Sequence, residues 1–272
     1  MNLSSPLRLA LLTGFLLALS IADTRGQESP RVLILPGERL TVGGRPGFVF
    51  LPPEAKRTTP QPWVMYAPTL AGTPDSHEKW MHERFLEAGI AVAGVDVGEA
   101  YGSPRGREGF SALYDELTIK RKFAAKPVLL GRSRGGLWVT SWAARNPGKV
   151  AGIAGIYPVF DLTTYPGLEK AAPAYGVSAE EMRQKLGELN PINRVDVLAR
   201  ARVPVFLIHG DEDKVVPLKE NSATFVDRYR EAGRSDLVTL IVAKGQGHNY
   251  WEGFFHCQPL VDFVIAKAKA AE

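Results

Sequence analysis

Cysteine is nearly absent from this chain, with Cys257 alone among 272 residues. A single cysteine cannot form an internal disulfide, so the fold must be held together by its core. Metal-binding patterns are missing as well, because the sequence has no cysteine cluster and no His-x-x-x-His pair. No Gly-x-Gly-x-x-Gly motif follows the first strand-like segment. The sequence therefore predicts neither a bound metal nor a dinucleotide cofactor.

A strong charge of one sign is absent too. The chain carries 33 Lys and Arg against 29 Asp and Glu, a formal net charge of +4, and its basic residues are scattered among acidic ones. A nucleic-acid surface requires a clustered basic patch, so no nucleic-acid partner is expected. The hydrophobic content of 45% is typical of one globular domain with an ample core.

One apolar stretch, residues 9–19, follows Arg8 near the N-terminus. A run of roughly 11 to 13 residues is too short for an ordinary membrane span but suits a secretory signal peptide. Ser20 and Ala22 supply small residues at the two positions that a signal peptidase reads. We therefore expect residues 1–22 to be a signal peptide and residues 23–272 to form a secreted or periplasmic domain, with no stable membrane span after processing. An uncleaved N-terminal anchor is the alternative.

Apolar segments alternate with amphipathic, helix-like segments from residue 63 onward. Several of the apolar segments have no polar face, as central strands of a parallel sheet require. This alternation predicts an α/β fold with a mainly parallel central sheet flanked by helices. The expected strands are residues 63–67, 90–95, 128–130, 150–156, 204–208 and 237–242.

Two parts of the chain depart from this alternation. Residues 32–35 and 47–51 are predicted to be antiparallel edge strands separated by a turn at residues 43–46. Residues 157–202 are rich in proline and tyrosine around a short helix expected near residues 179–189. That segment is expected to form a short cap insertion over the carboxyl edge of the sheet, where open parallel sheets build their sites.

The sequence Gly131-Arg132-Ser133-Arg134-Gly135 joins a buried strand to an amphipathic helix. This order predicts a nucleophile elbow, a tight turn that strains the serine backbone and raises its hydroxyl above the sheet. Glycine is needed two positions on either side, because a Cβ there would meet the adjacent strand or helix. The pentapeptide also occurs by chance in many proteins, but here the strand and the helix flank it in the required order. Ser133 is therefore the candidate nucleophile.

A serine hydroxyl is a poor nucleophile until a base takes its proton, and the base needs an acid to hold its tautomer. His248 is the expected base, since it lies after the last strand in a glycine-flanked loop that can reach Ser133. His209 falls at the buried end of a strand and is expected to be structural. Asp211 and Asp213 follow the same strand, and either could be the acid.

The chain order of serine, acid and histidine is that of the α/β-hydrolase superfamily, which the sequence resembles from about residue 63 to the C-terminus. The stretch His-Gly-Asp-Glu-Asp-Lys-Val-Val-Pro, residues 209–217, looks most like the branch of dienelactone hydrolases and prolyl-oligopeptidase-type esterases and peptidases. In that branch the catalytic acid is the aspartate that leads Asp-x-x-Val-Pro. The resemblance therefore implies Asp213 as the acid, with Asp211 bracing its loop.

The resemblance also implies an oxyanion hole made of two donors. The first is the backbone amide after the nucleophile, here that of Arg134, at the positive end of the following helix. The second comes from the loop after the strand at residues 63–67. Pro68 has no amide proton, so Thr69 or Leu70 must donate.

Arg132 and Arg134 flank the nucleophile. They are expected to pair with nearby carboxylates such as Asp96 or Glu99, or else to anchor an anionic group of the substrate, which would favour acidic esters. The leading prediction is an exported serine hydrolase, a carboxylesterase, acting on a small-molecule ester or an acylated saccharide. A peptidase for short peptides and a non-catalytic binding pseudo-hydrolase are the alternatives. No feature indicates the oligomeric state.

Overall fold

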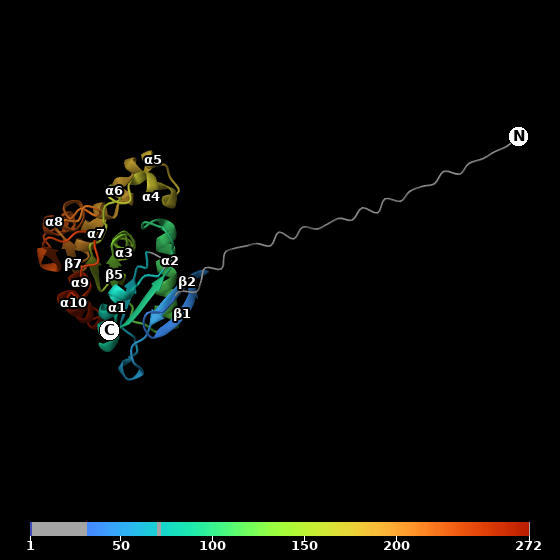
Figure 1. Cartoon of the computed structure of the whole chain (residues 1–272), viewed down its shortest axis with the longest axis vertical. Helices are drawn as coiled ribbons and strands as arrows, with labels where there is room; N and C mark the ends of the chain where they lie inside the picture. Colours follow the sequence, from blue (N-terminus) through green and yellow to red (C-terminus); the bar gives the residue numbers. More distant parts are fainter. Residues whose placement is uncertain (2–31, 70–71, 272) are drawn as a thin grey trace. The chain divides into compact units, whose positions relative to one another are not determined.

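An eight-stranded sheet runs through the protein in the order β1-β2-β4-β3-β5-β6-β7-β8 (Figure 1). The strands are β1 (Gly37–Val42), β2 (Arg45–Phe50), β3 (Trp63–Tyr66), β4 (Ala91–Val95), β5 (Val128–Arg132), β6 (Gly152–Ile156), β7 (Val205–Gly210) and β8 (Val238–Ala243). The computed structural model describes Met1, residues 32–69 and residues 72–271, and Arg31–Glu272 form one compact unit. β2 pairs antiparallel with β1 and β4, whereas all the other neighbours are parallel. The predicted fold, an α/β protein with a mainly parallel sheet, is confirmed.

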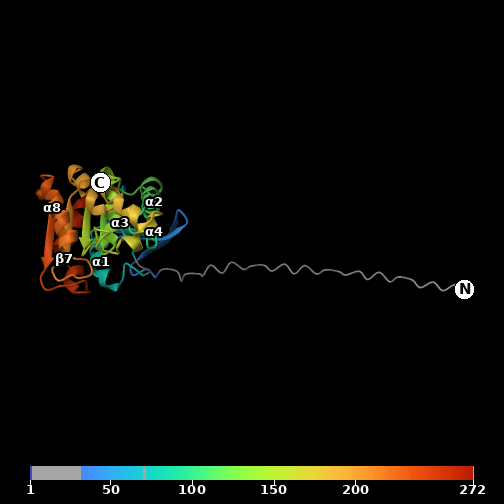
Figure 2. The ribbon, with the colours of Figure 1, turned by 90° about the horizontal axis from the view of Figure 1, so that it is seen from above.

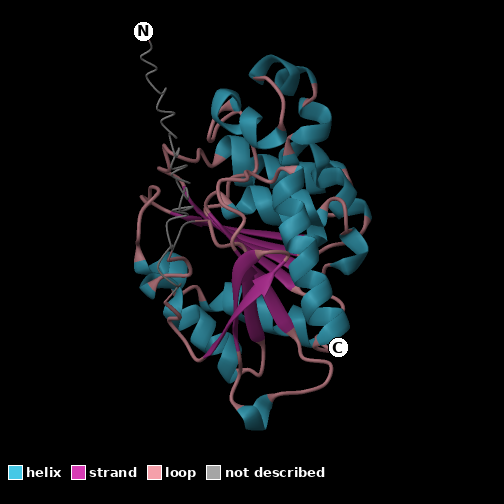
Figure 3. Cartoon of the chain, turned by 90° about the vertical axis from the view of Figure 1, so that its right-hand side faces the viewer, coloured by secondary structure: helices cyan, strands magenta, loops and turns pink. Residues whose placement is uncertain are grey.

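Helices cover both faces of this sheet (Figure 3). Every residue of β3 to β7 is buried, as it must be when both faces are covered. Side chains alternate along a strand, so Leu129 joins the hydrophobic cluster on one face and Leu130 joins the cluster on the other. The first face packs against α2 (Pro104–Asp115), α3 (Gly135–Ala143), α7 (Val195–Arg200) and α8 (Thr224–Glu231), and the second against α1 (Lys79–Glu87), α9 (Glu252–Phe255) and α10 (Gln258–Lys269).

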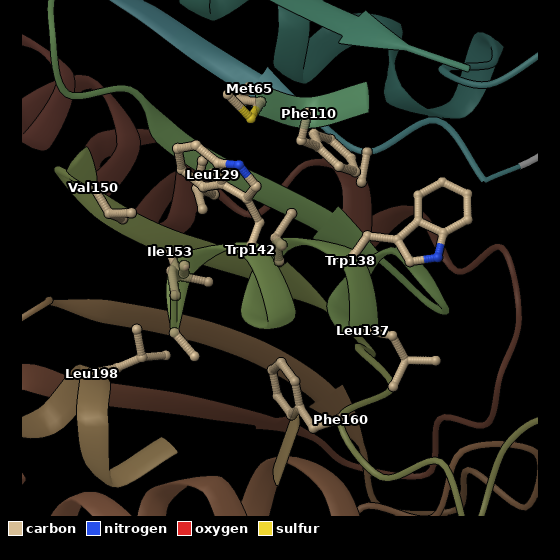
Figure 4. Close-up of a cluster of buried hydrophobic side chains, with 14 of the residues drawn as sticks. Met65, Phe110, Leu129, Leu137, Trp138, Trp142, Val150, Ile153, Phe160 and Leu198 are labelled. Atoms are coloured by element: carbon tan, nitrogen blue, oxygen red, sulfur yellow. The ribbon is translucent and has the colours of Figure 1, made fainter. Parts of the chain in front are cut away.

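All nine residues of α3 are buried, which is unusual for a helix beside a sheet. Figure 4 shows Trp138 and Trp142 of this helix among buried side chains that include Leu129, Ile153 and Phe110. Full burial of side chains of this size contributes about 1.5–3 kcal/mol each. The helix that follows Ser133 is therefore fixed by packing on all sides, which gives the turn before it a rigid support.

The first strand lies later in the chain than its apolar pattern predicted. Residues 32–35 form no strand, and β1 instead has the sequence Gly-Glu-Arg-Leu-Thr-Val. Gly43 and Gly44, with φ of 55° and 75°, form the two-residue turn between β1 and β2. An edge strand with solvent beside it does not need an apolar sequence. Leu35 is buried in the cluster on the second face, so its apolar character reflects packing rather than strand pairing.

The segment between β6 and β7 forms several short helices. They are α4 (Leu168–Tyr175), α5 (Ala179–Gln184) and α6 (Leu186–Leu189), which lie together in Figure 1, followed by α7. The single helix expected near residues 179–189 is therefore two helices, with Lys185 between them. α2 packs against both α3 and α4 (Figure 2), and the Tyr175 hydroxyl donates to the carbonyl of Tyr101 at 2.8 Å. These contacts attach the insertion to the sheet domain.

The predicted signal peptide, residues 1–22, lies outside the described residues apart from Met1. In the part of the chain that the structure describes, no helix combines the length and the apolar content needed to cross a bilayer.

His82 on α1 is fully buried, and neither of its ring nitrogens has a hydrogen-bond partner among the described residues. The rings of Phe50, Tyr66 and Phe85 lie 6.2, 5.3 and 5.8 Å from its own, centroid to centroid. Burial in this apolar surrounding lowers the pKa of His82 from 6.5 to about 3. The imidazole is therefore neutral in the folded protein over the whole mildly acidic range.

We expect His82 to make the protein sensitive to acid. Between pH 6.5 and about pH 3 the unfolded chain binds a proton that the folded chain excludes, so stability falls as the pH is lowered. The slope approaches about 1.4 kcal/mol per pH unit well below pH 6.5, so the loss between pH 6.5 and pH 4.5 is about 2 kcal/mol. His82→Phe should remove this contribution, which urea unfolding of both proteins across that interval would measure. Parallel pH profiles for the two proteins would contradict the assignment.

Candidate active site

Ser133 occupies the turn between β5 and α3 with a φ of 51°, a conformation that non-glycine residues rarely adopt. Its amide donates to the carbonyl of Ile156 at 2.9 Å, and its own carbonyl accepts from the amides of Gly136 and Val159. A Cβ on Gly131 would lie 2.8 Å from the Gly135 backbone, and one on Gly136 would lie 2.5 Å from the Val159 carbonyl. These two glycines leave no room for a side chain at the strained turn. Gly135, which the sequence analysis named as the second required glycine, is less restricted, since a Cβ there would lie 3.3 Å from the Ala67 side chain.

Three predicted site residues lie in one chain of hydrogen bonds. Ser133 Oγ is 2.9 Å from His248 Nε2, and His248 Nδ1 is 2.7 Å from Asp213 Oδ2. The serine follows β5, the aspartate follows β7 and the histidine follows β8, so all three stand at the carboxyl edge of parallel strands. With Nδ1 protonated, Nε2 is free to accept the serine proton. The arrangement can therefore transfer a proton from Ser133 to His248.

Asp213 has the environment of a permanently ionised acid. Its side chain is fully buried, and Oδ1 accepts from the amides of Val215 and Val216 at 3.0 and 2.8 Å. Burial alone would raise the pKa of this carboxyl, but hydrogen bonds from His209, His248 and the Val216 amide hold it well below its usual range. Asp213 therefore stays negative and can stabilise a protonated His248.

Asp211 lies in the same loop but does not contact His248. Its Oδ1 accepts from the Gly245 amide at 2.7 Å, and its Oδ2 lies 3.1 Å from Lys244 Nζ. These contacts tie the β7 loop to the turn that carries the histidine. Asp211 thus braces its loop, which is the role that the sequence analysis gave it when Asp213 is the acid.

His209 contacts the acid in a way that the sequence did not reveal. It is fully buried, as expected for a structural residue, with Nδ1 2.8 Å from Ser222 Oγ and Nε2 2.9 Å from the Val216 carbonyl. The same Nε2 lies 3.4 Å from Asp213 Oδ2. The spacing of four residues between His209 at the end of β7 and Asp213 in the loop that follows is the only sequence signal of this contact. His209 holds both ends of the turn that presents the acid.

The hydroxyl of Ser133 opens into a cavity of about 230 Å³. Arg134 is the N-cap residue of α3, where a helix leaves its first amides without acceptors in the helix, so its amide is available as an oxyanion donor. The amide of Thr69 donates to Thr73 Oγ1 at 3.1 Å, and Leu70 lies outside the described residues. The cavity is lined by Thr69, Thr73, Arg132, Ser133, Arg134, Tyr157, Tyr165, Val215, His248, Asn249 and Tyr250.

Both arginines beside the serine are paired with carboxylates. Arg134 Nη1 contacts Glu99, one of the two partners predicted for it, and its guanidinium lies 5.8 Å from the centre of the Tyr165 ring. Arg132 pairs instead with Asp75 and Glu78, through Nη1 at 2.9 and 2.8 Å. The capping box in which Asp75 and Glu78 lie opens the turn before α1, far from Arg132 in sequence. These pairs argue against the two arginines as anchors for acidic substrates, because carboxylates of the protein already neutralise their charge.

The described residues contain no group of three or more His, Cys, Asp and Glu side chains placed to hold a metal ion.

The fold and this geometry define a serine hydrolase of the α/β-hydrolase class. A family model, that of the prolyl oligopeptidase family, matches residues 112–256, which is more than half of the chain. The chain belongs to the prolyl oligopeptidase family. No curated protein matches it.

Solved structures with the same fold resemble this chain at low sequence identity. Est1E from Butyrivibrio proteoclasticus is 18% identical with a TM-score of 0.64, and the match covers 85% of this chain and 98% of Est1E. Puromycin hydrolase is 21% identical with a TM-score of 0.63, covering 87% of this chain and 39% of that one. A putative dipeptidyl aminopeptidase IV from Bacteroides ovatus is 15% identical with a TM-score of 0.66, covering 85% and 35%. This chain therefore spans well under half the length of the two last-named proteins.

Proposed function

We propose that this protein hydrolyses carboxylic esters through an acyl-enzyme on Ser133. The observation that carries the proposal is the continuous chain of hydrogen bonds from Ser133 through His248 to a buried, ionised Asp213, opening into a cavity. Membership in the prolyl oligopeptidase family supports a hydrolase with this type of chemistry.

In the proposed mechanism His248 acts first as a base and then as an acid. Its Nε2 takes the proton as Ser133 Oγ attacks the ester carbonyl carbon, and the carbonyl oxygen becomes an oxyanion that accepts from the Arg134 amide. When the tetrahedral intermediate collapses, the bond to the alcohol oxygen breaks and that oxygen takes the proton from His248. Water then attacks the acyl-serine by the same steps. This second attack releases the carboxylic acid product and regenerates Ser133. A second oxyanion donor is proposed from Thr69, once its amide turns away from Thr73, or from Leu70.

The size of the cavity supports a small acyl group. At about 230 Å³ it lies below the range of about 300–1,000 Å³ typical of pockets for drug-sized ligands. A short ester, or the acyl group of an acylated saccharide whose sugar remains outside, fits this volume. A peptidase acting on short peptides is the second candidate, because the family includes peptidases and one of the similar structures is named as a putative dipeptidyl aminopeptidase.

A fluorophosphonate probe tests the proposal, since it labels only an activated serine. We expect the parent to be labelled and Ser133→Ala to be unlabelled, which would exclude the binding pseudo-hydrolase. Acetyl, feruloyl and longer acyl esters, lactones and dipeptidyl anilides should then be compared by kcat/KM. Labelling together with turnover of anilides but not of esters would assign the protein as a peptidase.

Export stays a prediction of the sequence, because residues 2–22 lie outside the described part of the chain. We propose a secreted or periplasmic protein that begins near Asp23. An intact mass that still includes Met1 or Asn2 on the exported protein would contradict cleavage.

A further inference from the structure

Arg132 has two N–H groups with no acceptor among the described residues. A guanidinium has five donors. Nε donates to the Tyr157 hydroxyl at 3.1 Å, and Nη1 donates to Asp75 and Glu78. Both hydrogens of Nη2 remain. Because Arg132 is only 9% exposed and lines the cavity beside Ser133, the cavity is where these donors can be satisfied.

Tyr157 adds a third donor to the same wall. Its hydroxyl oxygen accepts from Arg132 Nε, while its hydroxyl hydrogen has no acceptor within the described residues. The residue is 3% exposed, lines the cavity, and has a φ of 34°, which breaks the side-chain alternation at the end of β6. Its ring packs against His248 with the centroids 4.4 Å apart. A strained backbone thus holds a hydroxyl in the wall of the cavity that Ser133 also lines.

The charge around these donors selects against anions. Arg132 is bonded to two carboxylates, Asp75 and Glu78, and Arg134 is bonded to Glu99. Three carboxyl groups therefore already contact the two guanidinium groups before Asp213 is considered, although burial raises the pKa of Glu78. A substrate carboxylate would have to displace one of them or be repelled, whereas an uncharged oxygen needs only the free hydrogens.

Apolar side chains stand at the mouth of this cavity, next to the exposed Asn249. Val215 and Tyr250, which line it, are 51% and 58% exposed and follow the acid and the base in sequence. The Arg132 guanidinium lies 5.2 Å from the centre of the Tyr250 ring. A ligand here would meet hydrogen-bond donors on one wall and apolar surface at the rim.

We propose that Arg132 Nη2 and the Tyr157 hydroxyl form a subsite for an uncharged oxygen of the substrate, an ether, a hydroxyl or a carbonyl, close to the scissile ester. This inference rests on the proposed ester hydrolysis and narrows its substrate class to oxygen-bearing esters, such as alkoxyacyl esters or acylated polyols. Arginine and tyrosine act here as binding residues that recognise the substrate.

The test compares esters that differ in one atom. On the acyl side the pair is p-nitrophenyl methoxyacetate and butanoate, and on the alcohol side it is 2-methoxyethyl acetate and butyl acetate. The ratio of kcat/KM within each pair is divided by the ratio of the rate constants for hydroxide-catalysed hydrolysis of the same two esters. This division removes the difference in their intrinsic reactivity. We expect a preference for the oxygen ester of about tenfold in one pair, the size of one hydrogen bond to a charged donor. A monosuccinate ester, the anionic comparison, should be poorer than methoxyacetate.

Two variants test whether Arg132 and Tyr157 cause the preference for the oxygen ester. Tyr157→Phe removes one donor without changing shape, and Arg132→Lys keeps the charge that Asp75 and Glu78 require while losing Nη2. Each should lower the oxygen-to-methylene ratio at least threefold, mainly through KM. Tyr165→Phe, which removes a hydroxyl from another part of the cavity wall, should keep the ratio. Circular dichroism and thermal melting identify any variant that fails to fold.

The outcomes distinguish a failure of the subsite proposal from a failure of the proposed ester hydrolysis. No oxygen preference in either pair, a preference that survives both variants, or a preference for the monosuccinate would overturn the subsite. If the parent is neither labelled by a fluorophosphonate nor active on any ester, the proposed function fails, and the subsite is tested by binding instead. Titration of Ser133→Ala with methyl methoxyacetate and methyl butanoate, followed by NMR, should then show tighter binding of the oxygen ester that Tyr157→Phe abolishes. Equal binding of the two esters would overturn the subsite in that case.

Discussion

Ser133→Ala should lower kcat for ester hydrolysis by about four to six orders of magnitude, and His248→Ala should lower it nearly as far. The two side chains form one proton-transfer unit joined at 2.9 Å, so losing either removes the nucleophile or the base that activates it. The residual rate would come from the oxyanion donor and from substrate binding, which neither variant removes.

Folding should be little affected by the serine substitution. Ser133 packs through its backbone, which donates to Ile156 and accepts from Gly136 and Val159, and alanine keeps these bonds. Circular dichroism and the melting temperature should stay close to those of the parent. Ser235→Ala, at an exposed serine in a short turn before β8, is the matched control and should keep full activity. Retention of more than about a tenth of the parental rate in Ser133→Ala or His248→Ala would remove these assignments.

Asp213→Asn is expected to lower kcat by about four orders of magnitude while the fold persists. The amide can still accept from the amides of Val215 and Val216 through its oxygen, which leaves its nitrogen facing His248 Nδ1. An NH2 group there donates instead of accepting, so the imidazole places its proton on Nε2. In that tautomer His248 cannot accept the proton of Ser133.

Asp211→Asn is the paired control for this prediction. The substitution removes an exposed contact with Lys244 but keeps an oxygen for the Gly245 amide, so it should reduce the melting temperature slightly and change kcat by less than about threefold. Measurement of kcat and of thermal melting on both variants distinguishes the acids. If Asp213→Asn kept its kcat and Asp211→Asn lost it, Asp211 would be the catalytic acid.

Most of the fold and the positions of the candidate triad residues could be predicted from local sequence patterns. Buried parallel strands need apolar residues on both faces, and a strained serine needs glycine neighbours, so β3 to β7 and the turn at Ser133 could be predicted. β8 was predicted from its apolar sequence although it is an edge strand with one buried residue. β1 could not, because this mostly exposed edge strand has the sequence Gly-Glu-Arg-Leu-Thr-Val, which carries no apolar pattern. The pairing of Arg132 with Asp75 and Glu78 was also missed, because it joins residues more than fifty positions apart and depends on where α1 begins. The contact of His209 with Asp213 depends on side-chain directions within one turn.

The edge strand β8 should open locally more easily than the central strands of the sheet. It is the last strand of the sheet, pairs only with β7, and has a single fully buried residue, whereas β5 is buried throughout. Edge elements with few buried contacts open at lower free energy than the centre of a fold. His248 follows the weakly held strand and Ser133 follows a strongly held one. On heating, the base should therefore detach from the nucleophile while the tryptophans of α3 remain packed, and catalysis should fade before the core melts.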